Sequence, residues 1–331
     1  MNTKPSSTLQ FTSTTHSERP KPGQEQPQVD ASTMVGAPRE RALVLGGGGS
    51  TGNAWLIGVI AGLFDVGLDI TTADLTIGTS AGSTAAAQLA GASPADLFAA
   101  ILAAAPNQRT VPVGSGPGRV PISPAMDHLE RIGKIIAASE DAADMRRRMG
   151  TAALDMDPAS DGAWQTQWRA IVASRLPSQH WPQRTVLITA VDAQTGEPVV
   201  FDRNSGIELA DAVAASCASG RPYRIGDSRY IDGGYRSNAE NADLAAAYGR
   251  VLVLSPFGGR SLVPKEWGTH LTTQVDELRA RGSRVETIFP ESNSEHMFGA
   301  NAMDLSLRPP AARAGHHQGR ALAEHLSEFW H

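Results

Sequence analysis

The stretch LTIGTSAGSTAAAQLAG, from Leu75 to Gly91, holds one serine in a glycine-flanked turn between two segments of different character. Its first residues, Leu75–Gly78, form a short apolar run that is typical of a buried strand. Ser83–Leu89 is rich in alanine and predicts a helix. A strand that passes through a glycine turn into a helix, twice in succession along this chain, indicates a parallel α/β sheet.

The turn itself, GTSAG, has Ser80 at its centre. Gly-x-Ser-x-Gly between a strand and a helix is the nucleophile-elbow pattern, in which a serine hydroxyl is presented on a very tight turn. Bulky residues at Gly78 and Gly82 would clash in such a turn. The start of the following helix would bring free N–H groups and a positive dipole end close to the hydroxyl. The pattern therefore predicts that Ser80 is a nucleophile.

A second glycine turn, GGGGSTG, begins at Gly46, after the apolar run Ala42–Leu45 and before a helix predicted over Asn53–Phe64. Two interpretations compete. The glycine spacing matches a dinucleotide-binding fingerprint, which needs an acidic residue at the end of the next strand. That strand ends instead in the Ser80 turn. The misfit favours the other interpretation, an oxyanion hole for acyl transfer.

The N–H groups of the consecutive glycines in this loop can form such an oxyanion hole, because glycine leaves the backbone open to a negative oxygen. The carboxyl ends of neighbouring parallel strands lie side by side. We therefore expect the glycine loop and Ser80 to meet at one edge of the sheet. A non-catalytic protein that binds nucleotide phosphate through the loop stays open as an alternative.

A serine nucleophile needs a base, and Asp232 is the best-placed acidic residue. It follows a strand predicted over Arg229–Ile231 and precedes Gly233 and Gly234, which open the turn around it. None of the nine histidines follows a strand in a glycine-opened turn. Asp232 is therefore the candidate acid of the site, and a Ser–His–Asp carboxylesterase with an unrecognised histidine stays open as an enzymatic alternative.

The glycine loop, the GTSAG turn and the later Asp-Gly-Gly, in this order, resemble the patatin family of lipid acyl hydrolases over Arg41 to Trp330. The resemblance implies an α/β fold of three layers, with a mostly parallel central sheet flanked by helices, over residues 39–331. It also implies a Ser80–Asp232 dyad that cleaves a lipid or acyl ester without histidine, cofactor or metal. By the same resemblance, the N–H groups of Gly47, Gly48 and Gly49 would form the oxyanion hole. Thr189 to Asp192 and Asn238 are supporting similarities.

The chain departs from the family pattern at positions that bear on the substrate. Thr51 stands where the family often has lysine or arginine, and the residues after Asn238 lack the usual proline. Pro222 is the nearest match to the proline that precedes the dyad aspartate. These departures concern the head group of the substrate more than the acyl chemistry, so the class of lipid stays open.

The remaining patterns complete a single domain. They predict a helix that starts at Pro94 with Ser93 as its N-cap, helical structure within Met126–Leu176, and helices over Glu208–Ser216 and Gly315–Trp330. They predict strands at Thr185–Val191, Val199–Asp202, Val251–Leu254 and Val285–Ile288. The strands at 185–191 and 199–202 form a hairpin or neighbouring pair. Thr110–Pro121 is rich in Gly and Pro and predicts a loop. With the helical stretch after it, this loop forms either a cover over the site or a passive insertion.

The composition narrows the possible partners. The 331-residue chain has a net charge of −5, so no overall basic field attracts nucleic acid. No apolar run is long enough to span a membrane, and we expect a cytoplasmic protein with at most transient peripheral membrane contact.

The Ser-, Thr-, Pro- and Gln-rich residues 1–38 predict a disordered tail. We expect a solvated helix face at Arg146–Arg148 and a small packing residue at Cys217, the single cysteine.

Overall fold

The computed structural model describes residues 40–104, 124–157 and 162–331. Residues 39–331 belong to one compact unit. The expected tail over residues 1–38 and the expected loop Thr110–Pro121 lie outside the described residues. The domain boundary at residue 38 and the cover over the site therefore stay predictions.

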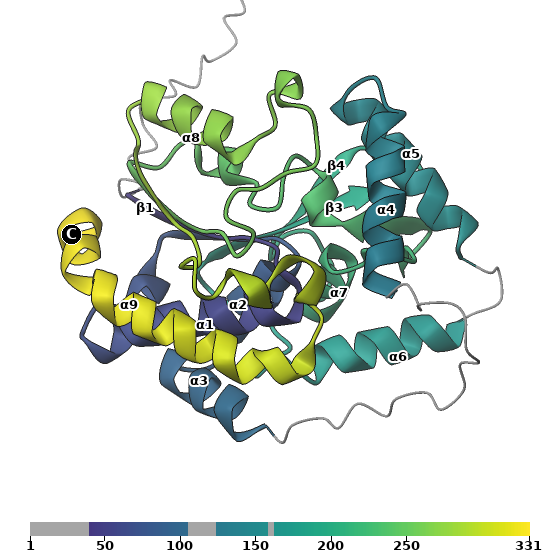
Figure 1. The fold of residues 1–331 in the computed structure, drawn as a ribbon. Coiled ribbons are helices and arrows are strands. Elements are labelled where there is room, and N and C mark those ends of the chain that lie inside the picture. The colour runs from purple at the N-terminus through teal and green to yellow at the C-terminus, as the bar shows by residue number, and fades with distance from the viewer. Residues whose placement is uncertain (1–39, 105–123, 158–161) are drawn as a thin grey trace, which may run out of the picture. The chain divides into compact units, whose positions relative to one another are not determined.

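One mixed, mostly parallel sheet organises the described residues (Figure 1). Its parallel part contains, in spatial order, β3 (Thr185–Asp192), β2 (Leu75–Gly78), β1 (Arg41–Leu45), β7 (Arg250–Leu254) and β8 (Arg284–Ile288). The apolar runs in the sequence predicted each of these strands to within one residue at either end.

Three further strands are antiparallel to their neighbours. β4 (Pro198–Phe201) folds back on β3, which confirms the predicted hairpin. β6 (Ser228–Asp232) also pairs with β3, and β5 (Tyr223–Ile225) pairs with β6. The sequence pattern did not predict β5, because three residues are too few to show an alternation of apolar and polar side chains.

β2 and β6 lie end to end along the same side of β3. Ile188 of β3 pairs with β4 on one side and with Gly78, the last residue of β2, on the other. Ala190 pairs likewise with β4 and, on the side of β2, with Asp232, the last residue of β6. Because β6 is antiparallel to β3, the carboxyl ends of β2 and β6 face each other across a gap of one β3 residue, Thr189.

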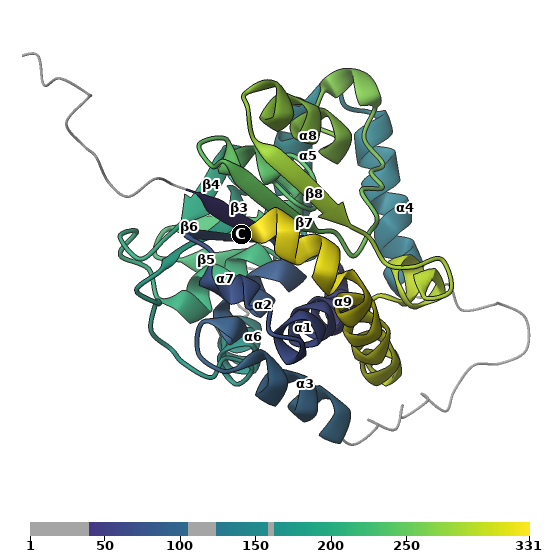
Figure 2. The same ribbon diagram turned by 90° about the vertical axis from the view of Figure 1, so that its left-hand side faces the viewer.

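Helices cover both faces of the sheet (Figure 1 and Figure 2). Along β1, Leu43 and Leu45 point to one helical layer and Ala42 and Val44 to the other, so the strand is apolar after Arg41. The first layer holds α1 (Gly49–Asp65), α2 (Ala81–Leu89), α3 (Pro94–Ala103), α6 (Gly162–Ala173), α7 (Leu209–Ser216) and α9 (Arg308–Trp330), and the second holds α4 (Pro124–Ala137), α5 (Ala142–Asp155) and α8 (Leu271–Ala280). This arrangement confirms the expected α/β fold.

Several helix boundaries differ from the sequence prediction. α1 begins at Gly49, inside the glycine loop, and α9 begins at Arg308, well before the predicted start at Gly315. The region predicted as helical after residue 126 contains α4, α5 and α6. α3 begins as predicted, since the N–H of Asp96 donates to Oγ of Ser93 at 3.1 Å.

α1 and α9 pack at backbone distance. Gly58 and Gly62 of α1 face α9, and Gly315 and Gly319 of α9 face α1. A Cβ at Gly58 would lie only 2.1 Å from the carbonyl oxygen of Ala312. The four-residue spacing puts the two glycines of each helix on one face. The small residues therefore allow α9 to cover α1 directly.

The first and last residues of the described unit meet beside β7 (Figure 2). The N–H of Arg250 donates to the carbonyl of Glu40 at 2.7 Å, and its guanidinium donates to the carbonyl of His331 at 3.0 Å. The guanidinium of Arg41 lies over the ring of Trp330, 5.6 Å from its centroid. β1 and the end of α9 are thus held together.

Gly58→Ala is expected to lower the free energy of unfolding by about 1–3 kcal/mol, because the added methyl group would force α1 and α9 apart. Gly133→Ala is the matched control. Gly133 lies within α4 with no atom within 4 Å of its Cβ position, so the better helix propensity of alanine should stabilise the protein by up to about 1 kcal/mol. Urea denaturation measures both changes, and equal stability of Gly58→Ala and the parent protein would contradict the close packing.

Candidate active site

Ser80 lies at the turn from β2 to α2 in a conformation that residues with a side chain rarely adopt. Its φ is 52° and its ψ is −114°, and such strain persists only where the surroundings hold it. A Cβ at Gly82 would lie 1.8 Å from the carbonyl oxygen of Leu45, and one at Gly78 would lie 2.6 Å from Cα of Ser83. Gly82 is therefore required for the turn to pack against β1, and Gly78 is required for the turn itself to close.

The hydroxyl of Ser80 donates a hydrogen bond of 2.8 Å to Oδ2 of Asp232. The two residues come from the facing strand ends, one directly after β2 and one at the end of β6. Asp232 is 8% exposed, and its Oδ1 accepts the N–H of Gly234 at 2.8 Å. The structure brings together the two side chains that the sequence analysis paired.

Burial raises the pKa of the Asp232 carboxyl to about 6. The hydrogen bonds from Gly234 and Ser80 limit the rise, because they favour the charged form. No cationic side chain among the described residues contributes to the shift. At neutral pH the carboxyl is therefore ionised, and it is more basic than an exposed aspartate.

A buried polar network holds the two strand ends together. The hydroxyls of Thr79 and Thr189 lie 2.9 Å apart, across the gap between β2 and β6. The amide of Asn241 donates to Thr79 Oγ1 and to the carbonyl of Gly233, both at 3.0 Å. Gly233 has no room for a side chain, since its Cβ would lie 2.2 Å from Thr189 Oγ1. The sequence analysis missed Asn241, whose φ of 57° is left-handed.

The glycine loop lies beside Ser80, as expected from parallel pairing of β1 and β2. A Cβ at Gly47 would lie 3.6 Å from Cβ of Ser80. The N–H of Gly47 donates to the carbonyl of Ala239 at 2.8 Å. This N–H is therefore occupied within the chain, whereas the sequence analysis expected it to bind the oxyanion. In the described part of the chain, the N–H groups of Gly48 and Gly49 have no acceptor. These two groups are available to a ligand oxygen.

Two residues at the end of α7, and one at the start of α2, add to the site. Oγ of Ser216 accepts the N–H of Ser80 at 2.9 Å, and Sγ of Cys217 donates to the carbonyl of Ser80 at 3.2 Å. Burial and the charge of Asp232 raise the pKa of the Cys217 thiol to about 11, so it stays protonated. The N–H of Ala81 has no acceptor among the described residues. The sequence analysis assigned no role in the site to Ser216 or Ala81.

The side chain of Thr51 is uncharged, so it brings no positive charge to the site. Thr51 is fully buried, so a longer side chain there would have to displace the core. A cation comes to the start of α1 from α9 instead. Arg308 donates to the carbonyl of Ser50 at 2.8 Å and to Oδ1 of Asn53 at 3.2 Å. The positive charge at this end of the glycine loop therefore comes from a distant part of the chain.

Glu240 lies beneath the glycine loop. It is 2% exposed, and its Oε1 accepts the hydroxyl of Ser255 at 2.6 Å. Its Cγ lies 3.3 Å from the Cβ position of Gly46. Burial raises the pKa of the Glu240 carboxyl to about 7. A titratable group therefore contacts the loop that adjoins Ser80.

Several histidines of the described residues have side-chain partners away from Ser80 and Asp232. The ring of His270 hydrogen-bonds to a backbone carbonyl, and His316 and His325 contact acidic residues of other elements. Within the described ranges no histidine hydrogen-bonds to Ser80 or Asp232. The geometry around the serine is that of a direct serine–carboxylate pair.

The basic cluster Arg146–Arg148 is divided between two environments. Two of its side chains are exposed and contact Asp144, as expected for a solvated helix face. Arg146 is instead half-buried and donates to the carbonyls of Gly196 and Arg236. It holds α5 against the loops that follow β3 and β6.

The described residues contain neither a candidate metal site nor a helix that could span a membrane. In residues 40–104, 124–157 and 162–331, no group of three or more His, Cys, Asp or Glu side chains could hold a metal ion. No helix in these ranges has both the length and the apolar character needed to cross a bilayer.

Comparison with known proteins gives one family match. A family model described as patatin-like phospholipase matches residues 43–245, which include the glycine loop, Ser80 and Asp232. Among solved structures, VipD from Legionella pneumophila is similar at 14% identity and a TM-score of 0.39, over 87% of this chain and 67% of VipD. The type III effector protein ExoU is similar at 16% identity and a TM-score of 0.35, over 86% of this chain and 54% of ExoU, about half its length. No curated protein sequence matches the chain.

Glu240→Gln is expected to flatten the pH dependence of stability. The carboxyl pKa rises from 4.5 to about 7 on folding, so its stabilising contribution is full below pH 4.5 and is lost as the pH rises to 7. The glutamine variant should lose less stability than the parent protein across this interval in thermal unfolding. Glu291→Gln, at an exposed position, is the matched control. Parallel curves for Glu240→Gln and the parent would contradict the prediction.

Proposed function

Because the chain belongs to the patatin-like phospholipase family, we propose that it is a lipid acyl hydrolase whose catalytic dyad is Ser80 and Asp232. The observation that carries the proposal is the hydrogen bond of 2.8 Å between the Ser80 hydroxyl and the buried Asp232 carboxylate. A hydroxyl in direct contact with a basic carboxylate can lose its proton as it attacks a carbonyl carbon.

The reaction proceeds through an acyl-enzyme. Ser80 Oγ attacks the carbonyl carbon of a lipid ester while Asp232 Oδ2 takes the hydroxyl proton. The ester C–O bond then breaks, and Asp232 returns the proton to the departing alcohol oxygen. Water attacks the acyl group on Ser80, Asp232 accepts the water proton, and that proton passes to Ser80 Oγ as the fatty acid leaves. Each cycle releases one alcohol and one fatty acid.

A carboxylate is an effective base here for physical reasons. An exposed aspartate has a pKa near 4 and is a weak base for a hydroxyl. Burial raises the pKa of Asp232 to about 6, and the direct contact with Ser80 needs no intermediary ring. The positive end of α2 stabilises the negative charge that develops on Ser80. General-base help of this kind contributes roughly 10²–10⁴-fold to rate.

We assign the oxyanion hole to the N–H groups of Gly48 and Gly49, with that of Ala81 as a further donor. Their lack of acceptors among the described residues supports this assignment. Gly47 has a different role, which is to leave room beside Ser80 because it has no side chain. One donor of an oxyanion hole is typically worth about 2.7–4 kcal/mol of transition-state stabilisation.

We also propose that the substrate is taken from a lipid surface during transient peripheral contact. Met303 and Leu305 are apolar and 66% and 46% exposed. Sδ of Met303 lies 3.1 Å from the Cβ position of Gly49, next to the proposed oxyanion hole. Exposed apolar side chains at the edge of a site suit contact with lipid. The cytoplasmic location stays a prediction.

Ser80→Ala and Asp232→Asn should each lose nearly all hydrolysis of a chromogenic acyl ester, since one lacks the nucleophile and the other the base. General-base loss alone predicts a fall of roughly 10²–10⁴-fold. His270→Gln is the control and should stay close to the parent. Substantial activity in either dyad variant would exclude the dyad.

A fluorophosphonate probe should label the parent protein at Ser80 and leave the Ser80→Ala protein unlabelled, because the probe reacts with activated serines. Mass spectrometry of the labelled peptide identifies the site. A protein that is not labelled at all would favour the nucleotide-binding alternative. Labelling that is lost on replacing a histidine would favour the Ser–His–Asp alternative.

The value of kcat/KM for a neutral ester should rise with pH to a plateau, with a midpoint near the Asp232 pKa of about 6. The sign follows from the mechanism, in which only the deprotonated carboxylate can accept the serine proton. Steady-state kinetics across this range measures the midpoint. A midpoint near 4, the value of an exposed carboxyl, would show that the base is not buried.

A further inference from the structure

Far along the chain, α9 and the turns before it return to the start of α1 (Figure 1). The carbonyl oxygen of Ala302 lies 2.9 Å from the Cβ position of Gly49. Arg308, the first residue of α9, donates to the carbonyl of Ser50 at 2.8 Å and to its hydroxyl at 3.1 Å. Residues outside the matched range 43–245 therefore contact the loop that holds the proposed oxyanion donors.

Asn53 extends the contact of Arg308 to a second helix. The guanidinium donates to Oδ1 of Asn53 at 3.2 Å. The amide nitrogen of Asn53 donates to Oε1 of Gln88 at 3.0 Å and to the carbonyl of Ala81 at 3.5 Å. Asn53 is buried, so its amide is shielded from water. Arg308 is thereby connected to the first residues of both α1 and α2, which supply the proposed oxyanion donors.

The positive charge of Arg308 has no carboxylate partner in the described part of the chain. Its hydrogen bonds end at a carbonyl, a hydroxyl and a side-chain amide oxygen, all of them neutral. Burial, and then the charge of the neighbouring Arg175, lower the pKa of the Arg308 guanidinium. Arginine still stays protonated at neutral pH, so an uncompensated positive charge lies at the start of α1.

The helix dipoles around Arg308 add to this charge instead of opposing it. Arg308 begins α9, contacts the first turn of α1, and reaches the start of α2 through Asn53. The N-terminus of a helix is partly positive, so acidic side chains stabilise it and cations do not. The first turns of α1, α2 and α9 contain no acidic residue. This arrangement lowers stability, and an anion at the Gly48 and Gly49 N–H groups would offset that loss.

We propose that Arg308 is a positioning residue for hydrolysis at Ser80. Its paired donors hold the first turn of α1 so that the N–H groups of Gly48 and Gly49 face the oxyanion, and its charge favours that oxyanion. The inference rests on the proposed ester hydrolysis and adds a residue that lies outside the motifs and the family match. The carbonyl oxygen becomes negative only as Ser80 attacks, so Arg308 should change kcat more than KM.

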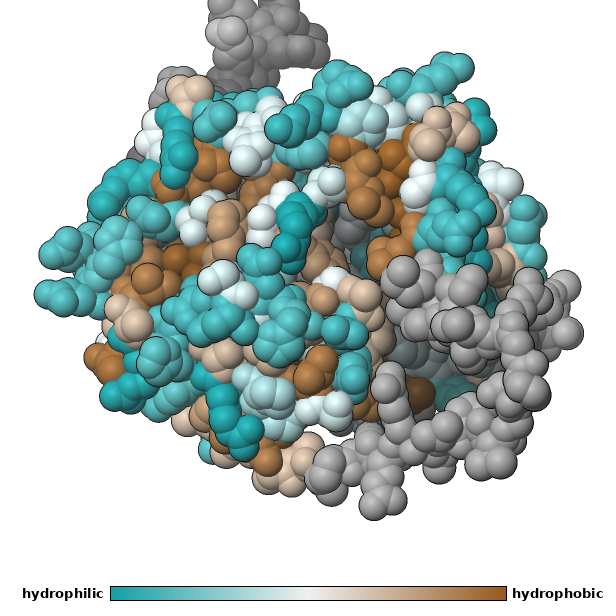
Figure 3. Space-filling model, viewed as in Figure 1, coloured by the Kyte–Doolittle hydropathy of each residue, from teal (hydrophilic) through white to brown (hydrophobic). Residues whose placement is uncertain are grey.

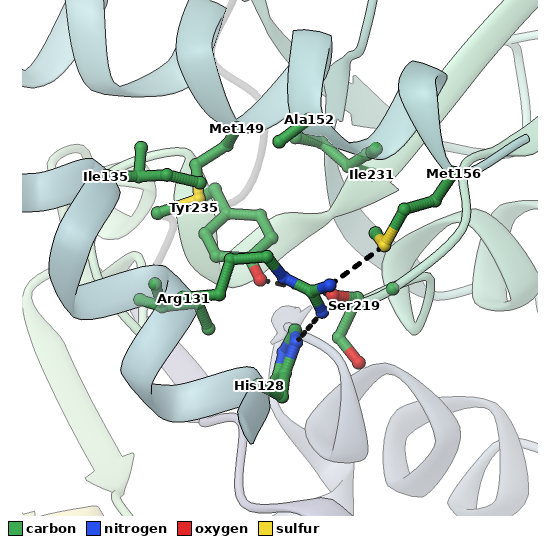
Figure 4. Close-up of a pocket in the computed structure, with 12 residues that line it drawn as sticks. His128, Arg131, Ile135, Met149, Ala152, Met156, Ser219, Ile231 and Tyr235 are labelled. Carbon is green, nitrogen blue, oxygen red and sulfur yellow. Dashed lines mark hydrogen bonds between the residues drawn. The ribbon is translucent and has the colours of Figure 1, made fainter. Parts of the chain in front are cut away.

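A guanidinium without a carboxylate partner is not sufficient for this role, as Arg131 shows. It lines a pocket between α4, α5 and β6 (Figure 4), beside α4, where Figure 3 shows a hollowed and largely hydrophobic surface. Its hydrogen-bond partners are His128 and Met156, so within the described residues it does not bond to the glycine loop. Ile231 also lines this pocket, and because side chains alternate along β6, Asp232 points to the opposite face.

The first test measures hydrolysis of para-nitrophenyl butyrate, a neutral and soluble ester. Arg308→Gln should lower kcat by roughly ten- to a hundredfold and leave KM within about twofold, because the loop that Arg308 holds is misplaced only slightly. Arg308→Lys keeps the charge without the paired donors and should lose less. Two control variants should retain the parental kcat: Arg131→Gln, and Arg313→Gln at an exposed position of α9.

Equal kcat in Arg308→Gln and the parent would overturn the proposal, because a residue that only ties α9 to α1 would change stability and not turnover. An equal fall in Arg313→Gln would also overturn it, since net charge would then be the cause. Thermal unfolding by circular dichroism shows that each variant is folded at the assay temperature. If Arg308→Gln does not fold, Arg308→Lys decides, and a parental kcat in that variant would overturn the proposal.

The second test measures how tightly the site holds the oxyanion. With an octyl trifluoromethyl ketone, Ser80 Oγ bonds to the carbonyl carbon, the carbonyl oxygen takes the electron pair and becomes negative, and the hydroxyl proton passes to Asp232. Octyl methyl ketone stays a neutral carbonyl and serves as the matched inhibitor. Arg308→Gln should weaken inhibition by the trifluoromethyl ketone by the same factor as it lowers kcat/KM, and inhibition by the methyl ketone should not change. Equal losses for the two ketones would overturn a role at the oxyanion.

The same measurements separate this inference from the proposed function. If the parent hydrolyses the ester and Arg308→Gln hydrolyses it equally well, the role of Arg308 fails and the dyad stands. If the parent neither hydrolyses the ester nor binds the trifluoromethyl ketone in calorimetry, the proposed function fails, and the role of Arg308 fails with it.

Discussion

The carboxylate of Asp232 is buried beside a hydroxyl rather than a cation, and much of the surrounding structure serves to keep it there. Burial of a charge without an ion pair is unfavourable unless hydrogen bonds replace the lost water. The N–H of Gly234 and the hydroxyl of Ser80 supply those bonds, and the part of the cost that they do not offset raises the pKa to about 6. The same cost makes the carboxylate a stronger base. A feature that lowers stability thus provides the reactivity on which the proposed chemistry depends.

β3 makes this contact possible, because it is long enough to pair with two strands that approach from opposite directions. β2 ends opposite Ile188 and β6 ends opposite Ala190, so Thr189 fills the gap and bonds to Thr79. A shift of either strand by one residue would turn its last side chain to the other face of the sheet. The Asn241 amide bonds to both sides of the gap and opposes such a shift.

The local parts of the site and the pairing of Ser80 with Asp232 could be predicted from sequence, but most other long-range contacts could not. Gly78 is required by the sterics of the turn itself, and the short apolar strands are visible as uninterrupted runs. Gly82 is required by the close approach of β1, although it belongs to the recognisable GTSAG pattern. The direction of β6 depends on its pairing with β3, which the residues SRYID do not reveal. The acceptor of the Gly47 N–H is the carbonyl of Ala239, and the cation near Ser50 is the guanidinium of Arg308. Both partners lie far away in the sequence. α8 was missed although Leu271, Val275 and Leu278 have helical spacing and are buried.

The contacts of Arg250 with Glu40 and His331 bring the two ends of the described unit to one residue. A short peptide could join those ends, and new termini could be opened in the exposed turn at Gly226, between β5 and β6. In such a circular permutant the aspartate would precede the glycine loop and the serine along the chain, while every contact between them stayed in place. The order of the motifs, which makes the family recognisable, is therefore separable from the geometry that brings the hydroxyl and the carboxylate together.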